Sequence, residues 1–219
     1  MPRLLFEKKG NAIWISHLDL MRVFQRSFKR AGLPLTHTQG FNPRPSVSIA
    51  LPLSVGIESS CELLDFDLDG EPIPEAEIKR RLNEKLVEGV RVLDVYTGGQ
   101  KIKYLALLDC CLTLQYDGGV PEGAAEKITA LLSREEVTVT KKSKSGNTEQ
   151  NIIPMIRKAA VRETNPNTLT VQARICCQNP SLNPMQIAFA IEKYLPECTP
   201  SFVECSRMEI YDQKEQQFR

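Results

Sequence analysis

The chain has 219 residues, of which 42% are hydrophobic and 25% are charged. This balance is typical of a globular protein, and the length suits one large domain or two small ones. The longest apolar runs, LALL and IALPL, are far shorter than the roughly 20 residues that span a bilayer. No secretory signal pattern opens the sequence, so we expect a cytoplasmic protein without a membrane segment.

The cysteine pattern argues against disulfides and metal centres. The seven cysteines contain neither CxxC nor CxxxCxxC. Zinc and iron–sulfur sites need closely spaced thiolates, and a cytosolic chain of this size is not expected to rely on disulfides. We therefore expect no metal and no cofactor. The pairs Cys110-Cys111 and Cys176-Cys177 fall on two predicted strands, and we interpret them as small buried hydrophobes.

Charge is distributed unevenly along the chain, although its net value is only +1. Up to Arg44, eight Lys or Arg side chains face two acidic ones, so this segment carries roughly +6. Residues 58–94 are acidic on balance. The early segment is therefore the region where an anionic ligand is expected.

The first half of the chain predicts the element order strand, helix, strand, strand, helix, strand. Residues 3–15 indicate a strand with a bulge or tight turn at Gly10-Asn11. A helix then begins at Ser16, with Asp19 completing an imperfect capping box, and ends at Gly32. Its apolar face recurs at spacings of three and four: Leu18, Met21, Phe24, Phe28 and Ala31. The remaining elements are strands at 47–53 and 62–68, a helix at 75–88 and a strand at 91–96.

The second half repeats this order with an insertion. Strands are predicted at 104–116, 137–142, 169–177 and 202–211, and helices at 121–133 and 183–195. Residues 143–150 predict a polar loop, and 152–160 a short apolar insert of one or two helical turns. The fold class is therefore α+β, with two ferredoxin-like (βαββαβ) halves in tandem and antiparallel sheets, at residues 1–98 and 99–219.

The first predicted helix carries a basic stripe opposite its apolar face. Arg22, Arg26 and Arg30 recur at spacing four, with Lys29 beside them. The stripe is either an ordinary solvated face or a surface that binds phosphates through charge and counterion release.

His17 is the first residue of this helix, where exposed amides attract anions. Its imidazole could contact a phosphate, act as a general acid or base, or be an exposed histidine beside a cap. His37, a single polar residue in THTQ, is interpreted as a loop residue.

The stretch QGFNPRP at residues 39–45 predicts a rigid loop. Gly40 permits a positive φ, and Asn42 before Pro43 favours an extended or turn conformation. Gln39, Asn42 and Arg44 would present polar groups. Phe41 would either anchor the loop in the core, which we favour, or stack on a base.

Taken together, the words SHLDLM, RAGLP, GFNPRP and LPLxxGxxS make the chain resemble the radical-SAM-linked protein family, DUF2344, strongly over about residues 4–70. The resemblance implies a cobalamin-binding radical SAM protein as partner, in a neighbourhood of RNA-processing and ribosomal-protein genes. Because this chain lacks CxxxCxxC, it would be the companion and not the radical enzyme. The motif positions that match are Ser16, His17, Leu18, Asp19, Gln39, Gly40, Phe41, Asn42 and Pro43.

The leading hypothesis is an accessory RNA-binding or adaptor protein that works with the radical SAM enzyme in RNA or ribosome-associated modification or processing. The residues expected to contact RNA or phosphate are His17, Arg22, Arg26, Lys29, Arg30, Gln39, Asn42 and Arg44. Ser16, Asp19, Gly40, Phe41 and Pro43 would shape the motif. Two alternatives stay open: a metal-independent RNA-cleaving or modifying enzyme centred on His17, and a protein-only scaffold for the radical SAM partner.

Overall fold

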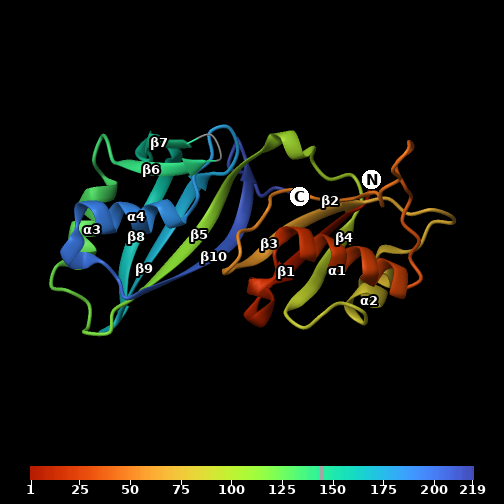
Figure 1. The fold of residues 1–219 in the computed structure, drawn as a ribbon, viewed down its shortest axis with the longest axis horizontal. Coiled ribbons are helices and arrows are strands. Elements are labelled where there is room, and N and C mark those ends of the chain that lie inside the picture. The colour runs from red at the N-terminus through yellow and green to blue at the C-terminus, as the bar shows by residue number, and fades with distance from the viewer. Residues whose placement is uncertain (144–145) are drawn as a thin grey trace. The chain divides into compact units, whose positions relative to one another are not determined.

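The computed structural model describes residues 1–143 and 146–219. Over these ranges the fold is mixed α+β, with four α-helices and mostly antiparallel strands (Figure 1). The chain divides into two compact units, residues 1–102 with Arg219, and residues 103–218. No α-helix in the described ranges combines the length and the apolar character needed to cross a membrane.

The first unit contains an antiparallel sheet in the order β4-β1-β3-β2. Its strands are β1 (Arg3–Lys8), β2 (Val47–Ile49), β3 (Ile57–Phe66) and β4 (Val90–Tyr96). Helix α1 (His17–Arg30) follows β1, and helix α2 (Glu75–Asn83) follows β3. Hydrophobic side chains of both helices share one core with β1, β3 and β4.

Aromatic side chains fix α1 on the sheet. Phe24 meets Phe6 of β1 edge to face with ring centroids 4.7 Å apart, and Phe28 lies 5.1 Å from Phe66 of β3. Such pairs add to the stabilisation that comes from burying apolar area. The predicted apolar face was wrong at Leu18, whose side chain is exposed, because Leu20 occupies the buried position at the start of the helix.

Residues 10–14 correct a second expectation, because they form a 3-10 helix, η1 (Gly10–Trp14), and do not continue the strand. Lys8 is buried and donates from Nζ to the carbonyl oxygens of Ile13 (3.1 Å) and Ile15 (2.8 Å). Its burial lowers the pKa of the ammonium. At Gly89, a Cβ would come within 2.4 Å of the Lys9 carbonyl oxygen, so only glycine allows this close approach to η1.

The second unit contains a sheet in the order β10-β5-β9-β8, also antiparallel throughout. Its strands are β5 (Leu105–Gln115), β8 (Ile156–Asn165), β9 (Thr168–Cys176) and β10 (Phe202–Asp212). Helix α3 (Ala124–Leu132) follows β5, and α4 (Met185–Tyr194) follows β9. Three short 3-10 helices also occur from residue 102 onward: η2 (Ile102–Tyr104), η3 (Ile153–Met155) and η4 (Pro196–Cys198).

The segment between α3 and β9 differs most from the sequence-based expectation. β6 (Thr138–Ser143) leaves the main sheet and pairs with β7 (Gly146–Asn151) as a separate hairpin, where a polar loop was predicted; residues 144 and 145 of that loop lie outside the described ones. The predicted helical insert at 152–160 is η3 followed by β8. β8 escaped prediction because most of its side chains are exposed, so that backbone pairing with β9 defines it and no apolar alternation marks it.

The interpretation of the two cysteine pairs as buried hydrophobes is confirmed for Cys110, Cys176 and Cys177, whereas Cys111 is half-buried. Cys110 and Ala173 are paired across β5 and β9, as expected for neighbouring strands. Burial raises the pKa of Cys177 and Cys205 to about 12, so neither thiol is ionised at neutral pH.

Candidate functional site

The start of α1 is fixed by its cap. Ser16 has an extended backbone, and its Oγ accepts a hydrogen bond from the Asp19 amide at 3.2 Å. The same hydroxyl donates to the Asp19 carboxylate at 2.7 Å, which replaces the reach back to the backbone that a capping box would make. The hydrogen bonds from Ser16 and then Arg22 lower the pKa of Asp19. The predicted cap is confirmed.

His17 lies half-buried at this helix start, and its Nδ1 atom is buried. Among the described residues, none forms a hydrogen bond or an ion pair with the imidazole. The nearby carboxylate of Asp19 is bound to Ser16 and Arg22. Asp19 is therefore not the group that orients the imidazole in this structure.

The basic face of α1 contains two kinds of cation. All four side chains are exposed, but Arg22 is paired with Asp19 at 2.7 Å, and Arg30 donates to the Lys85 carbonyl at 2.8 Å. Within the described ranges, the side chains of Arg26 and Lys29 have no hydrogen-bond or ion-pair partner. These two charges are therefore available to an external anion.

The motif loop is the tip of a hairpin, which we call the 36–46 hairpin. Ser46 N donates to Thr36 O (2.8 Å) and Thr38 N to Arg44 O (2.9 Å), while Arg44 N also donates to Thr38 Oγ1 (3.0 Å). Residues 39–43 close the turn, with Gly40 at φ +132°, a conformation that side chains disfavour. The tip is exposed along its whole length, so Gln39, Asn42 and Arg44 present their side chains to solvent.

The position of Phe41 shows that its interpretation as an anchor in the core was wrong. Its side chain is fully exposed at the hairpin tip and contributes nothing to the core. The turn is held by the hydrogen bonds between the two arms, so it does not need an aromatic anchor. Of the two roles considered for this residue, only that of a stacking surface is compatible with its position.

A groove of about 440 Å³ lies between α1 and the arms of the hairpin. Helix α1 contributes Gln25 and Lys29, and the hairpin contributes His37 and Pro45. Leu33, Pro34 and Leu35, which join the helix to the hairpin, complete the wall. His37, assigned from the sequence to a loop without a role, is thus part of a concave surface that also holds an unpaired cation.

The predicted residues do not all meet at this groove. His17 and Lys29 are twelve residues apart on one helix, which separates them by about 18 Å along its axis. The groove therefore brings together the end of the basic stripe and the hairpin arms, but not the helix start. Neither His17 nor the tip residues Gln39 and Asn42 line it.

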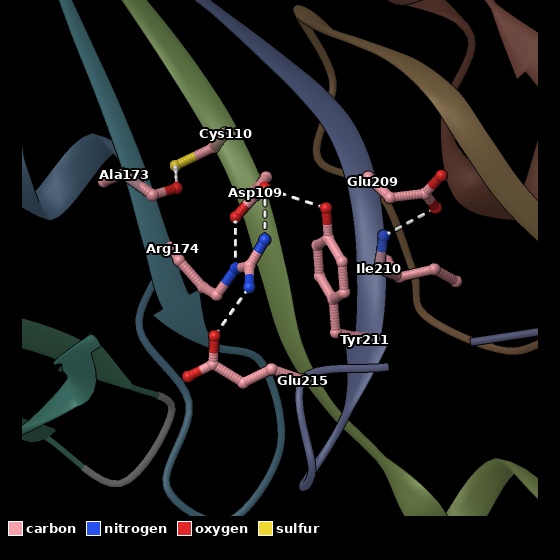
Figure 2. A network of polar contacts seen from close by, with 8 residues as sticks. All are labelled: Asp109, Cys110, Ala173, Arg174, Glu209, Ile210, Tyr211 and Glu215. Atoms are coloured by element: carbon pink, nitrogen blue, oxygen red, sulfur yellow. Dashed lines mark hydrogen bonds and ion pairs between the residues drawn. The ribbon is translucent and has the colours of Figure 1, made fainter. Parts of the chain in front are cut away.

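The second unit holds a charge network that the sequence reasoning missed (Figure 2). Arg174 of β9 binds both carboxylate oxygens of Asp109 on β5, at 2.7 and 2.8 Å, and donates to Glu215 at 2.6 Å. The guanidinium lies 3.7 Å from the ring centroid of Tyr211, whose hydroxyl donates to Asp109 at 3.0 Å. The buried guanidinium on β9 therefore joins β5, β10 and the segment after β10 that contains Glu215. These four side chains are called the Arg174 network below.

The Arg174 network keeps its carboxylate ionised. Burial alone would raise the pKa of Asp109, but the hydrogen bonds from Arg174 and Tyr211 outweigh it and the pKa lies below its ordinary value. Burial and the bond to Asp109 raise the pKa of Tyr211. The network borders a hollow of about 530 Å³, which Ala160 on β8 and the exposed Lys158 and Gln172 also line.

One sequence signal could have revealed this network. Asp109 interrupts the apolar run LALLDCCLTL, and Arg174 interrupts VQARICC. A charged residue inside an otherwise apolar strand either faces solvent or has a buried partner. The sequence does not say which, because the partner lies on a different strand.

Comparisons with solved structures show what the fold is similar to. The crystal structure of a Cbf5-Nop10-Gar1 complex contains a chain that matches with a TM-score of 0.54 at 10% identity, over 95% of this chain and 48% of that one. A chain of the archaeal box H/ACA sRNP Nop10-Cbf5 complex matches with a TM-score of 0.47 at 9% identity, over 94% and 46%. The chain thus spans about half the length of these matched chains. The first likeness supports a shared fold and nothing further.

No curated protein matches the sequence. A family model described as "Uncharacterized protein conserved in bacteria (DUF2344)" matches residues 2–184, well over half of the chain. That match includes the cap of α1, the basic stripe, the 36–46 hairpin and the Asp109–Arg174 pair. The chain therefore belongs to the DUF2344 family of proteins conserved in bacteria.

Proposed function

We propose that this protein is an accessory RNA-binding or adaptor protein that works with a cobalamin-binding radical SAM enzyme, in the modification or processing of RNA or of a ribosome-associated target. The observation that carries the RNA part is the groove, where the unpaired Lys29 of the basic stripe and His37 of the hairpin line one concave surface. Arg26, also without a partner among the described residues, lies on the same exposed helix face.

The electrostatic argument distinguishes this face from an ordinary solvated helix. Helix α2 is the internal comparison, because its Arg80 and Arg81 are both paired with Glu77 on the same helix. On α1 the one acidic residue, Asp19, neutralises only Arg22. Excess positive charge with few internal partners favours polyanions, and binding is then coupled to counterion release.

Fluorescence anisotropy with labelled RNA at increasing salt tests the proposal. We expect log affinity to fall linearly with log salt, and the variant Arg26→Glu/Lys29→Glu to lose most of the binding. The matched control is Arg91→Glu/Lys101→Glu, which reverses one exposed arginine and one exposed lysine of the same unit outside the groove. Absence of binding at low salt, or equal loss in both variants, would refute RNA binding at this face.

The radical SAM partner rests on the resemblance carried by SHLDLM, RAGLP and GFNPRP. Co-purification of the protein from its native cells, with nuclease added to one half of the sample, tests it. Recovery of a radical SAM protein in both halves supports direct docking. If the radical SAM protein is lost only from the nuclease-treated half, the two proteins are connected through a shared RNA and not by direct contact. If the radical SAM protein is absent from both halves, the partnership is contradicted.

The proposal includes two ferredoxin-like halves in tandem. Within the first unit, the elements run βαββαβ and the strands lie in the order fourth, first, third, second. The second unit gives the same order once the β6–β7 hairpin is treated as an insertion. These orders support the assignment, in which α1 of the first unit corresponds to α3 of the second.

A second candidate, a protein-only scaffold, is favoured by a separate observation. Trp14 and Leu18 near the start of α1 are 65% and 67% exposed, which is unusual for large apolar side chains and suits a protein contact. If Trp14→Ser/Leu18→Ser abolishes co-purification of the radical SAM partner while RNA affinity is unchanged, docking uses this end of the helix. If the double variant still co-purifies with the radical SAM partner, the scaffold hypothesis is wrong.

A further inference from the structure

We propose that the groove between α1 and the 36–46 hairpin accepts an unpaired nucleotide, so that the RNA bound here is single-stranded and not duplex. This inference rests on the proposed RNA-binding function and deepens it. It is carried by three independent features of the first unit: an apolar wall in the groove, a fully exposed aromatic ring at the hairpin tip, and unpaired cations on the adjoining helix face.

The groove has the size and chemistry of a small-ligand site. Its volume of about 440 Å³ lies within the usual range of roughly 300–1,000 Å³. Pro34, Leu35 and Pro45 offer apolar surface, which a base inside a duplex cannot reach but an unstacked base can. Gln25, whose amide has no partner among the described residues, supplies a donor and an acceptor for a base edge.

The groove is built in advance of binding. The two hairpin arms are hydrogen-bonded to each other, and both are tied to the chain after β3, because Thr36 N donates to Asp67 O (3.0 Å) and Asp67 N donates to Ser46 O (3.1 Å). On the helix side, Leu33 N donates to Phe28 O at 3.0 Å and closes the end of α1. A wall held in this way requires little ordering when a ligand enters, which favours affinity.

Phe41 adds a stacking surface at the edge of the same hairpin. An aromatic side chain that buries nothing in the folded protein gains from contact with a second flat apolar surface, and each base–aromatic stack is worth about 5- to 150-fold in affinity. Duplex RNA keeps its bases stacked on each other and hides them from such a ring. The exposed ring therefore discriminates in favour of single strands.

Charge on the adjoining helix face suits the backbone of the same strand. Arg26 and Lys29 are three residues apart on α1, and so lie next to each other on its surface. No carboxylate is among the described residues that line the groove, while Asp67 at the hairpin base accepts a hydrogen bond from Thr36 Oγ1 at 3.3 Å. A phosphate beside the groove thus meets cations and no opposing acid in its wall.

The test compares a labelled single-stranded RNA with a duplex of the same length, by anisotropy at one salt concentration. We expect the single strand to bind at least about tenfold more tightly. Phe41→Ala should lower the affinity for the single strand by about tenfold and leave the affinity for the duplex unchanged. Phe202→Ala, an exposed phenylalanine of the second unit, is the matched control and should change neither.

A second variant tests the groove itself. Gln25→Trp fills the groove without changing its charge, and should lower the affinity for the single strand. Circular dichroism should show that the variant keeps an intact fold. If single strand and duplex bind equally, or if both Phe41→Ala and Gln25→Trp bind the single strand like the wild type, the inference is wrong although RNA binding stands. If neither RNA binds, the proposed function fails as well.

Discussion

The basic face of α1 and the Arg174 network place positively charged side chains in opposite environments. Arg174 is buried, binds two carboxylates and lies on a tyrosine ring. Arg26 and Lys29 are exposed and have no side-chain partner among the described residues. The first arrangement commits the charge to holding strands together, and the second leaves it open to solvent. Position in the fold, and not residue type, therefore separates the buried, paired cation from the exposed, unpaired ones.

This difference has energetic consequences that can be measured separately. Breaking a buried ion pair leaves an uncompensated charge in a poorly solvated place, which destabilises the fold strongly. Removing an exposed cation changes stability little, because water solvates both states almost equally. Loss of stability should therefore follow changes in the second unit, and loss of RNA affinity should follow changes on α1.

The largest effect is expected from Arg174→Met. Asp109 and Glu215 would lose their shared partner, so the free energy of unfolding should fall by about 3 kcal/mol. Urea denaturation followed by circular dichroism measures it. Arg162→Met, an exposed arginine on β8, is the control and should stay within about 0.5 kcal/mol of the wild type. Equal stability of the two variants would show that the network is not structural.

The next effect concerns affinity and compares the two kinds of cation on α1. Arg26→Ala/Lys29→Ala should lower the affinity for single-stranded RNA by about tenfold. The slope of log affinity against log salt should become shallower by about 1.4, since each lost phosphate contact removes about 0.7. Arg22→Ala/Arg30→Ala removes cations already paired with Asp19 and the Lys85 carbonyl, and should cost less. Equal losses would mean that internal pairing does not decide which cations bind.

The pH dependence of stability should reveal the ionised carboxylate of the network. The folded-state pKa of Asp109 is lowered, so its contribution to stability is complete above the ordinary carboxyl pKa, about 4, and is lost as pH falls through the lower folded value. One such proton changes the free energy of unfolding by at most about 1.4 kcal/mol per pH unit.

Urea midpoints measured between pH 7 and pH 2 test this expectation. The wild type should lose stability more steeply than Asp109→Asn in the acid range, because the variant has no carboxylate to protonate. Asp19→Asn is the comparison on α1, where the lowered pKa belongs to an exposed carboxylate. An identical acid slope in the wild type and Asp109→Asn would contradict the assigned role.

The smallest effect is expected from Ser16→Ala at the start of α1. The amide of Asp19 would lose its acceptor, and loss of such a cap costs about 1 kcal/mol. Thermal unfolding measures the change, and Ser16→Asp, which restores an acceptor, should recover most of it. RNA affinity at the groove should be preserved in both variants, because the groove lies at the other end of the helix.

Local chemistry made much of the first unit predictable. Ser16 and Asp19 lie three residues apart, so the sequence shows their cap directly, and Gly32 with Pro34 marks the end of α1. The alternation of apolar residues likewise indicates the main strands. Prediction failed where side chains do not report the structure, as in β8, whose pairing with β9 is made by backbone groups.

The sequence by itself determined the cap of α1, its basic stripe, the turn-forming character of residues 39–43 and the burial of Cys110, Cys176 and Cys177, because each depends on neighbours within a few residues or on apolar character. Only the tertiary structure decided that Phe41 points into solvent, that His37 and Lys29 share a groove, and that Arg174 reaches Asp109, 65 residues away in sequence. Those outcomes depend on which segments of the folded chain lie side by side, and no local pattern of residues specifies these tertiary neighbours.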